Sequence, residues 1–110
     1  WKDINIKYFG EDMNVDEEIS IEWARIPHFY SDFYVYQYAT GYAAASSFAN
    51  SILSKGEEAV EKYKGFLKAG GSMYPIDTLK MAGVDMTTSK PLKDTLDRFN
   101  ELLDMLEEII

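Results

Sequence analysis

The residues best suited to chemistry gather in one short segment, Ile26 to Tyr38. It contains the single histidine of the chain, His28, and four tyrosines: Tyr30, Tyr34, Tyr36 and Tyr38. Between Ile26 and Ser54, only His28 and Asp32 carry a charge or titrate near neutral pH. An imidazole and several phenols with little competing charge could hold a developing oxyanion in a dry cleft.

The same cluster also has a purely structural explanation. Tyrosines at helical spacing more often pack in a core or at its rim, with each hydroxyl bonded to a carbonyl or to water. A lone histidine is more often a structural hydrogen-bonding group than a catalyst. The residue types by themselves leave both explanations open.

Two other segments resemble ligand sites only in composition. Gly70-Gly71-Ser72 lacks the spacing and the Gly-Lys-Ser/Thr ending of a phosphate loop, so it predicts a helix end and a turn. The acidic stretch from Glu11 to Glu17 lacks the ligand order and central glycine of an EF-hand, so it predicts a solvated turn.

Composition narrows the classes of function. The chain has 110 residues, of which 46% are hydrophobic, enough for one modest core. Its 11 Lys and Arg face 19 Asp and Glu, and the net charge of −8 disfavours nucleic acid as a partner. With no cysteine and one histidine, it cannot supply a disulfide, a thiolate nucleophile or a metal site of several Cys or His ligands.

The sequence predicts neither a targeting segment nor a membrane partner. Trp1 to Asn5 lacks the basic start and apolar run of a signal peptide, so we expect a cytoplasmic protein, cut from a longer chain because it does not start with Met. Phe33 to Ser54 carries no charge over 22 positions, which is long enough to cross a bilayer. Its tyrosine, serine and amide groups would be costly in hydrocarbon, so we expect a helix buried in protein.

Hydrophobic periodicity predicts helices throughout and no strand, so the expected fold class is all-α. Glycine and proline delimit the segments. The expected helices are one that ends before Gly10, then 16–25, 31 or 32 to about 54, 57–68, 75–81, and a last one opened by Pro91.

Three of these helices have predicted faces. The helix 57–68 has a stripe expected to be buried: Ala59, Val60, Tyr63, Phe66 and Leu67. The last helix has an apolar stripe, expected to pack within the chain: Leu92, Leu96, Phe99, Leu103, Leu106 and Ile110. The uncharged helix that ends near Ser54 is expected to be buried on all sides, which a chain of this length achieves only inside a larger body.

The segments EWARIPHFY at Glu22–Tyr30 and FYVYQYATG at Phe33–Gly41 resemble the C-terminal region of the oligoendopeptidase F family of thimet oligopeptidase-like zinc peptidases. The likeness continues through FLKAGGS at Phe66–Ser72, YP at Tyr74–Pro75 and AGVDMT at Ala82–Thr87, so it covers nearly the whole chain. It implies that residues 1–110 are a single C-terminal helical fragment, a bundle within a larger α-helical catalytic domain with a deep channel.

The resemblance also implies a zinc endopeptidase that hydrolyses short peptides. In this family zinc is held by a His-Glu-x-x-His helix and a glutamate from a later helix. No His-Glu-x-x-His occurs here, so zinc is expected in the full-length parent, none is expected on this fragment, and the fragment alone is expected to be inactive.

Residue roles follow from the resemblance. His28 matches a substrate-binding histidine, Tyr36 is the best match for the main tyrosine that stabilises the transition state, and Tyr30 for a second. Tyr34 and Tyr38 remain alternatives and candidate substrate-binding residues, as do Gly70 and Gly71.

Three functions compete at this stage. The chain is part of a zinc peptidase, or a stand-alone all-α module whose tyrosine-rich face binds a peptide or partner, or a dimerisation piece that uses the stripe from Leu92 to Ile110. An upstream His-Glu-x-x-His helix in the parent gene favours the first, and a natural start near Trp1 favours the second. An oligomer could form through exposed helical surfaces.

Overall fold

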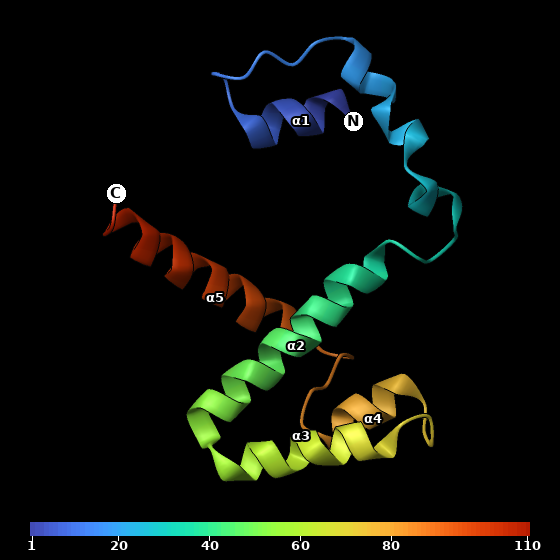
Figure 1. Ribbon diagram of the computed structural model, residues 1–110, viewed down its shortest axis with the longest axis vertical. Helices are drawn as coiled ribbons and strands as arrows, with labels where there is room; N and C mark the ends of the chain where they lie inside the picture. The colour runs from blue at the N-terminus through green and yellow to red at the C-terminus, as the bar shows by residue number, and fades with distance from the viewer. The chain divides into compact units, whose positions relative to one another are not determined.

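The computed structural model describes residues 1–110, and all of its regular structure is helical (Figure 1). The elements, in chain order, are α1 (Lys2–Phe9), the 3₁₀ helices η1 (Glu18–Arg25) and η2 (Pro27–Tyr30), α2 (Tyr36–Lys55), α3 (Glu57–Ala69), α4 (Pro75–Met81) and α5 (Lys90–Glu107). The expected all-α class is confirmed. None of the helices combines the length and the apolar composition needed to cross a membrane.

The chain forms two compact units, unit 1 (Trp1–Gln37) and unit 2 (Tyr38–Ile110). In unit 1, α1 ends as predicted at Gly10, whose φ of 82° lies in a region that glycine adopts without steric cost. Trp1 meets Phe29 edge to face, with ring centroids 5.9 Å apart. Lys2 forms an ion pair with Glu17, so residues on either side of η1 contact α1 or its N-cap.

The predicted helix 16–25 is present and has 3₁₀ geometry. It begins at Glu18 with Glu17 at the N-cap, and the Oδ1 of Asp16 accepts a hydrogen bond from the N–H of Ile19 in its first turn at 3.2 Å. The helix stops before Pro27, where Ile26 is extended with φ −89° and ψ 105°. That conformation is the one a proline imposes on the residue before it.

The start of α2 differs from the prediction. The sequence places it at Ser31 or Asp32, but the helix begins at Tyr36 and residues 31–35 form turns. Phe33 has φ 57°, and a residue in the left-handed region cannot continue a right-handed helix. The predicted end near Gly56 is confirmed, with φ 62° at that residue.

The core of unit 2 packs α2 and α3 against the segment that follows α4. Its buried members are Ala44, Phe48, Ala82 and Val84. The Phe48 ring lies 5.2 Å from Tyr63 and 5.1 Å from Phe66, centroid to centroid. The helices α3 and α4 lie side by side (Figure 1).

The predicted face of α3 is largely confirmed. Ala59 is buried, and Val60, Tyr63 and Phe66 are half-buried. The predicted burial of Leu67 is wrong, because this residue is 59% exposed. It lies at the margin of the stripe, where unit 2 offers no element to cover it.

Only Ala43, Ala44, Ser47 and Phe48 of α2 are buried, so this chain does not enclose the helix on all sides. The sequence analysis expected such burial only inside a larger body, and that expectation stays a prediction. The predicted packing of the α5 stripe within the chain is wrong, because the stripe is exposed, from 41% at Leu103 to 95% at Ile110. The 110 residues provide too few elements to cover it.

Candidate functional site

The helix η2 positions His28 and Tyr30. Pro27 occupies its first turn, where a fixed φ and a missing N–H fit the start of a helix. The turn closes when the N–H of Ser31 donates to the carbonyl of His28 at 3.3 Å. A four-residue 3₁₀ turn therefore presents both side chains.

The structure brings His28 together with Tyr34. Their rings are stacked, with centroids 5.6 Å apart and an interplanar angle of 22°. The chain between them reverses through the turn 31–35, in which the N–H of Tyr34 donates to the carbonyl of Ser31 at 3.3 Å. Tyr34 is 39% exposed, the least of the four tyrosines in the cluster.

Tyr30 lies on the same helix as His28 but makes a different contact. Its hydroxyl donates to the backbone carbonyl of Ala24 at 2.6 Å, which joins η2 to the end of η1. The phenol proton is therefore directed at a backbone oxygen in this structure.

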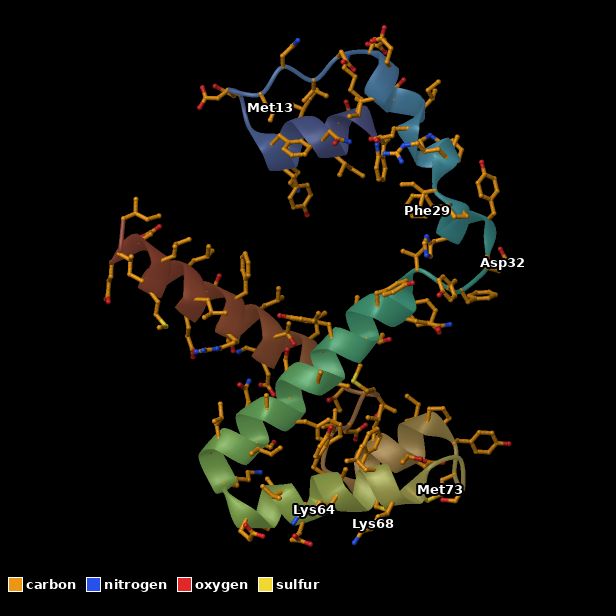
Figure 2. The ribbon with its side chains drawn as sticks, in the orientation of Figure 1. Met13, Phe29, Asp32, Lys64, Lys68 and Met73 are labelled. Atoms are coloured by element: carbon orange, nitrogen blue, oxygen red, sulfur yellow. The ribbon has the colours of Figure 1, made fainter.

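Tyr36 and Tyr38 lie at the start of α2. Their side chains are 58% and 59% exposed. Figure 2 labels Phe29 and Asp32, which mark η2 and the turn that leads from it to α2. The chemical roles of the tyrosines and of His28 stay predictions.

Gly70 and Gly71 end α3 and begin the turn before α4. Gly70 has φ 51°, and the N–H of Ser72 donates to the carbonyl of Ala69 at 3.1 Å. The helix end and turn expected from the sequence are confirmed, and the proposed contact with substrate stays a prediction.

Few charged side chains lie in the segment that carries His28 and the four tyrosines. Arg25 pairs with Glu22, and this hydrogen bond is the main reason that the pKa of the Glu22 carboxyl is lowered from its ordinary value. From Ile26 to Gln37 the only carboxylate is Asp32. Neutral ring donors thus have little competition from charged groups.

The residues of this chain do not fit a zinc centre. No group of three or more His, Cys, Asp or Glu side chains is arranged to hold a metal ion. With one histidine and no cysteine, the chain also lacks the usual nitrogen and sulfur ligands.

Unit 2 contains a cavity of about 270 Å³ that the sequence analysis missed. It lies between α2, the loop after α4 and the start of α5, and none of the predicted site residues lines it. Its wall on α2 consists of Lys55 and four uncharged polar residues, Ser47, Asn50, Ser51 and Ser54. This spacing places the four on one helix face, and it could have been recognised in the sequence.

Lys55, Asp85, Lys90 and Asp94 are the charged residues that line this cavity. Lys90 lies 2.7 Å from Asp94, and Lys80 lies 3.1 Å from Asp85. The Ser47 hydroxyl oxygen is sealed from solvent and has no hydrogen-bond partner. Two of the charged lining residues, Lys90 and Asp94, thus pair with each other, and Lys55 adds a further cation to the wall.

Asp85 organises the loop beside the cavity. Its Oδ1 accepts hydrogen bonds from the hydroxyl of Thr87 at 2.6 Å and from the N–H of Thr87 at 3.0 Å. These bonds, the first of them above all, and the nearby Lys80 ammonium lower the pKa of the Asp85 carboxyl from its ordinary value.

Comparison with known proteins finds one family of peptidases. The model of "Peptidase family M3" matches residues 1–98. The chain is 56% identical over 108 residues to Oligopeptidase PepF of Bacillus subtilis, covering 98% of this chain and 16% of that protein. It is 48% identical over 103 residues to an Oligoendopeptidase F homolog of Borreliella burgdorferi, covering 94% of this chain and 18% of that protein.

A solved structure is similar over the same range. The crystal structure of oligoendopeptidase-F from Enterococcus faecium matches with a TM-score of 0.85 and 48% identity, over 97% of this chain and 20% of that one. The chain thus spans about a sixth to a fifth of the length of these relatives.

Proposed function

The chain belongs to peptidase family M3, and from that premise we propose that it forms the substrate-binding, oxyanion-stabilising C-terminal part of a zinc endopeptidase that hydrolyses short peptides. Its 110 residues act as one fragment of a larger catalytic domain. The zinc ligands belong to the part of such a protein that lies outside this chain, because the residues here do not fit a metal centre.

In this proposal His28 and Tyr36 are the principal donors. When water attacks a peptide bond, the carbonyl carbon becomes tetrahedral and its oxygen gains negative charge. An imidazole N–H and a phenol O–H directed at that oxygen each lower the barrier by about 3 kcal/mol. Tyr30 serves as a second phenol once its hydroxyl leaves the Ala24 carbonyl, and Tyr34, Tyr38, Gly70 and Gly71 line the bound peptide.

The observation that carries the proposal is the family match over residues 1–98, which includes the whole ring-bearing segment. The relatives' names supply the peptidase activity and its restriction to oligopeptides. The sparse fixed charge between Ile26 and Gln37 supports it further, since neutral donors act best on an oxyanion where no carboxylate competes.

The test uses a chimera, in which this chain replaces the matching segment of the Bacillus subtilis relative. His28→Ala and Tyr36→Phe should each lower kcat by about 100-fold on a short fluorogenic peptide, with KM changed by less than about threefold. Tyr42→Phe, on the same helix as Tyr36, is the control and should leave both constants unchanged.

A KM increase without a loss of kcat would assign the residue to binding alone. Unchanged kinetics for both His28→Ala and Tyr36→Phe in an active chimera would refute the proposed chemistry.

The isolated 110-residue chain should hydrolyse no peptide, with or without added zinc, because it lacks the ligands that hold the metal. Zinc-dependent cleavage by the purified chain would contradict the proposal. The reading frame of the parent gene gives an independent check, since the proposal requires a His-Glu-x-x-His helix before residue 1.

A further inference from the structure

We infer that Tyr34 is a positioning residue, whose ring holds the His28 imidazole in the orientation from which it donates to the substrate. This inference rests on the proposed function, because it assigns Tyr34 a role through His28. It replaces the direct substrate contact considered for Tyr34 above.

The first observation is the stack itself. The two rings lie nearly parallel, 22° apart, with centroids separated by 5.6 Å, within the range at which ring pairs attract one another. An imidazole on an exposed four-residue turn has several open rotamers. A ring packed on one of its faces favours one of them and does not itself cover the edge, where the nitrogen atoms lie.

The second observation is the strained backbone that delivers Tyr34. The residue before it, Phe33, has φ 57°, a genuine outlier for a bulky side chain. Phe33 is 81% exposed, so burial of its own ring does not stabilise this conformation. Strain of this kind persists only where the surroundings over-determine it, and it concentrates at functional sites.

The third observation is the set of bonds that hold the strained turn. The Gln37 side chain donates from Nε2 to the Phe33 carbonyl at 2.9 Å. The Gln37 N–H donates to the Tyr34 carbonyl at 3.1 Å. Together with the stack on His28, these bonds tie the turn to the first residues of α2, so the backbone on both sides of Tyr34 is fixed.

The experiment uses the active chimera and a double-mutant cycle. Tyr34→Leu should lower kcat by about two- to tenfold with little change in KM, and Tyr34→Phe, which keeps the stacking ring, should restore kcat. In the His28→Ala background, Tyr34→Leu should have no further effect, because the group that Tyr34 positions is absent.

A merely structural role for Tyr34 would give the same loss in both backgrounds, and that result overturns the inference. Equal losses of kcat for Tyr34→Phe and Tyr34→Leu would also overturn it, because they would assign the function to the hydroxyl. If His28→Ala leaves kcat unchanged, the proposed function fails together with the inference. If His28→Ala lowers kcat and Tyr34→Leu does not, only the inference fails.

A backbone variant provides a second, independent measurement. Phe33→Gly tolerates a left-handed φ and should keep kcat within about twofold of the parent chimera. Phe33→Val cannot adopt that conformation easily, so it should reproduce the kcat loss of Tyr34→Leu. Equal kcat values for the two Phe33 variants would show that the turn does not position the ring, and would overturn the inference.

Discussion

The hydroxyl of Tyr30 donates a hydrogen bond to the backbone carbonyl of Ala24 at 2.6 Å, which joins the two 3₁₀ helices of unit 1. Tyr30 is one of the two tyrosines proposed to stabilise the oxyanion, but its proton already has an acceptor. Tyr30→Phe in the chimera should therefore lower kcat by less than Tyr36→Phe does.

The same substitution should have a measurable effect on unit 1. Loss of one partly exposed hydrogen bond should lower the free energy of unfolding by about 0.5–1 kcal/mol. Chemical denaturation of the 110-residue chain, with Tyr8→Phe as the control, measures that change. If Tyr30→Phe reduces kcat more than Tyr36→Phe, the order of the two donors must be reversed.

The core of unit 2 depends on Phe48, whose ring contacts both Tyr63 and Phe66. Phe48→Ala should lower the free energy of unfolding by about 3–5 kcal/mol, because it removes buried ring surface and leaves a cavity. This loss is large enough to abolish cooperative unfolding in a small domain. Leu53→Ala, on the same helix but 85% exposed, is the control and should change stability by no more than about 0.5 kcal/mol.

Asp85 gives a prediction that depends on pH. Its pKa is lowered in the folded chain, chiefly by the hydroxyl of Thr87. A lowered folded-state pKa contributes stability that is present above the unfolded-state value of about 3.9, and that is lost as the pH falls through the folded-state value. Thr87→Val should raise the pKa of Asp85 and so reduce this acid dependence.

Carboxyl chemical shifts, followed by NMR through an acid titration, measure this change directly. Glu22, whose carboxyl pKa is lowered chiefly by its hydrogen bond with Arg25 and not by Thr87, is the internal reference. An unchanged Asp85 titration in Thr87→Val would show that the hydroxyl does not lower its pKa.

The exposed stripe of α5 predicts self-association of the isolated chain. Exposed apolar surface of this extent favours association, so sedimentation should show a mass that increases with protein concentration. Leu96→Glu together with Leu103→Glu should abolish the increase. Because both leucines are already exposed, the free energy of unfolding should change by no more than about 0.5 kcal/mol.

Met105→Glu is the control for added negative charge: it places one charge, against two in the stripe variant, on the opposite side of α5, where Met105 is 53% exposed. If Met105→Glu prevents association as well as the stripe variant does, added charge and not the stripe explains the result. A chain that stays monomeric at all concentrations contradicts the prediction outright.

The sequence predicted the helices well where local chemistry determines them. Gly10, Gly56 and Pro75 mark ends and starts that glycine conformation and proline geometry impose, and all three are confirmed. The Asp16 carboxylate accepts a hydrogen bond from the first turn of the helix that follows it, although Glu17 is the N-cap residue. These signals act within a few residues, so they do not depend on the rest of the fold.

The start of α2 was missed for a physical reason. Ser31 and Asp32 are good N-cap residues, and no feature of the sequence marks Phe33 for a left-handed conformation that its type disfavours. The contacts that hold it come from Gln37 and from the stack of Tyr34 on His28. Such contacts between specific side chains are not encoded in the conformational propensity of Phe33 itself.

The candidate site was predicted from residue types and from family resemblance. The sequence identified the segment that carries His28 and the tyrosines, but it could not identify the pairing of His28 with Tyr34 or the bond from Tyr30 to Ala24. Both depend on the reversal of the chain at residues 31–35, which was expected to be helical.

The uncharged surface of α2 has a consequence for mutational tolerance. Ala45 and Ala49 face outwards in this chain, so a screen for folding alone should accept lysine or glutamate at either position. A screen for peptide cleavage by a complete enzyme should reject the same changes wherever the surrounding body presses against the helix. Positions of α2 that accept a charge in the folding screen but reject it in the cleavage screen would identify the residues that the rest of the enzyme covers.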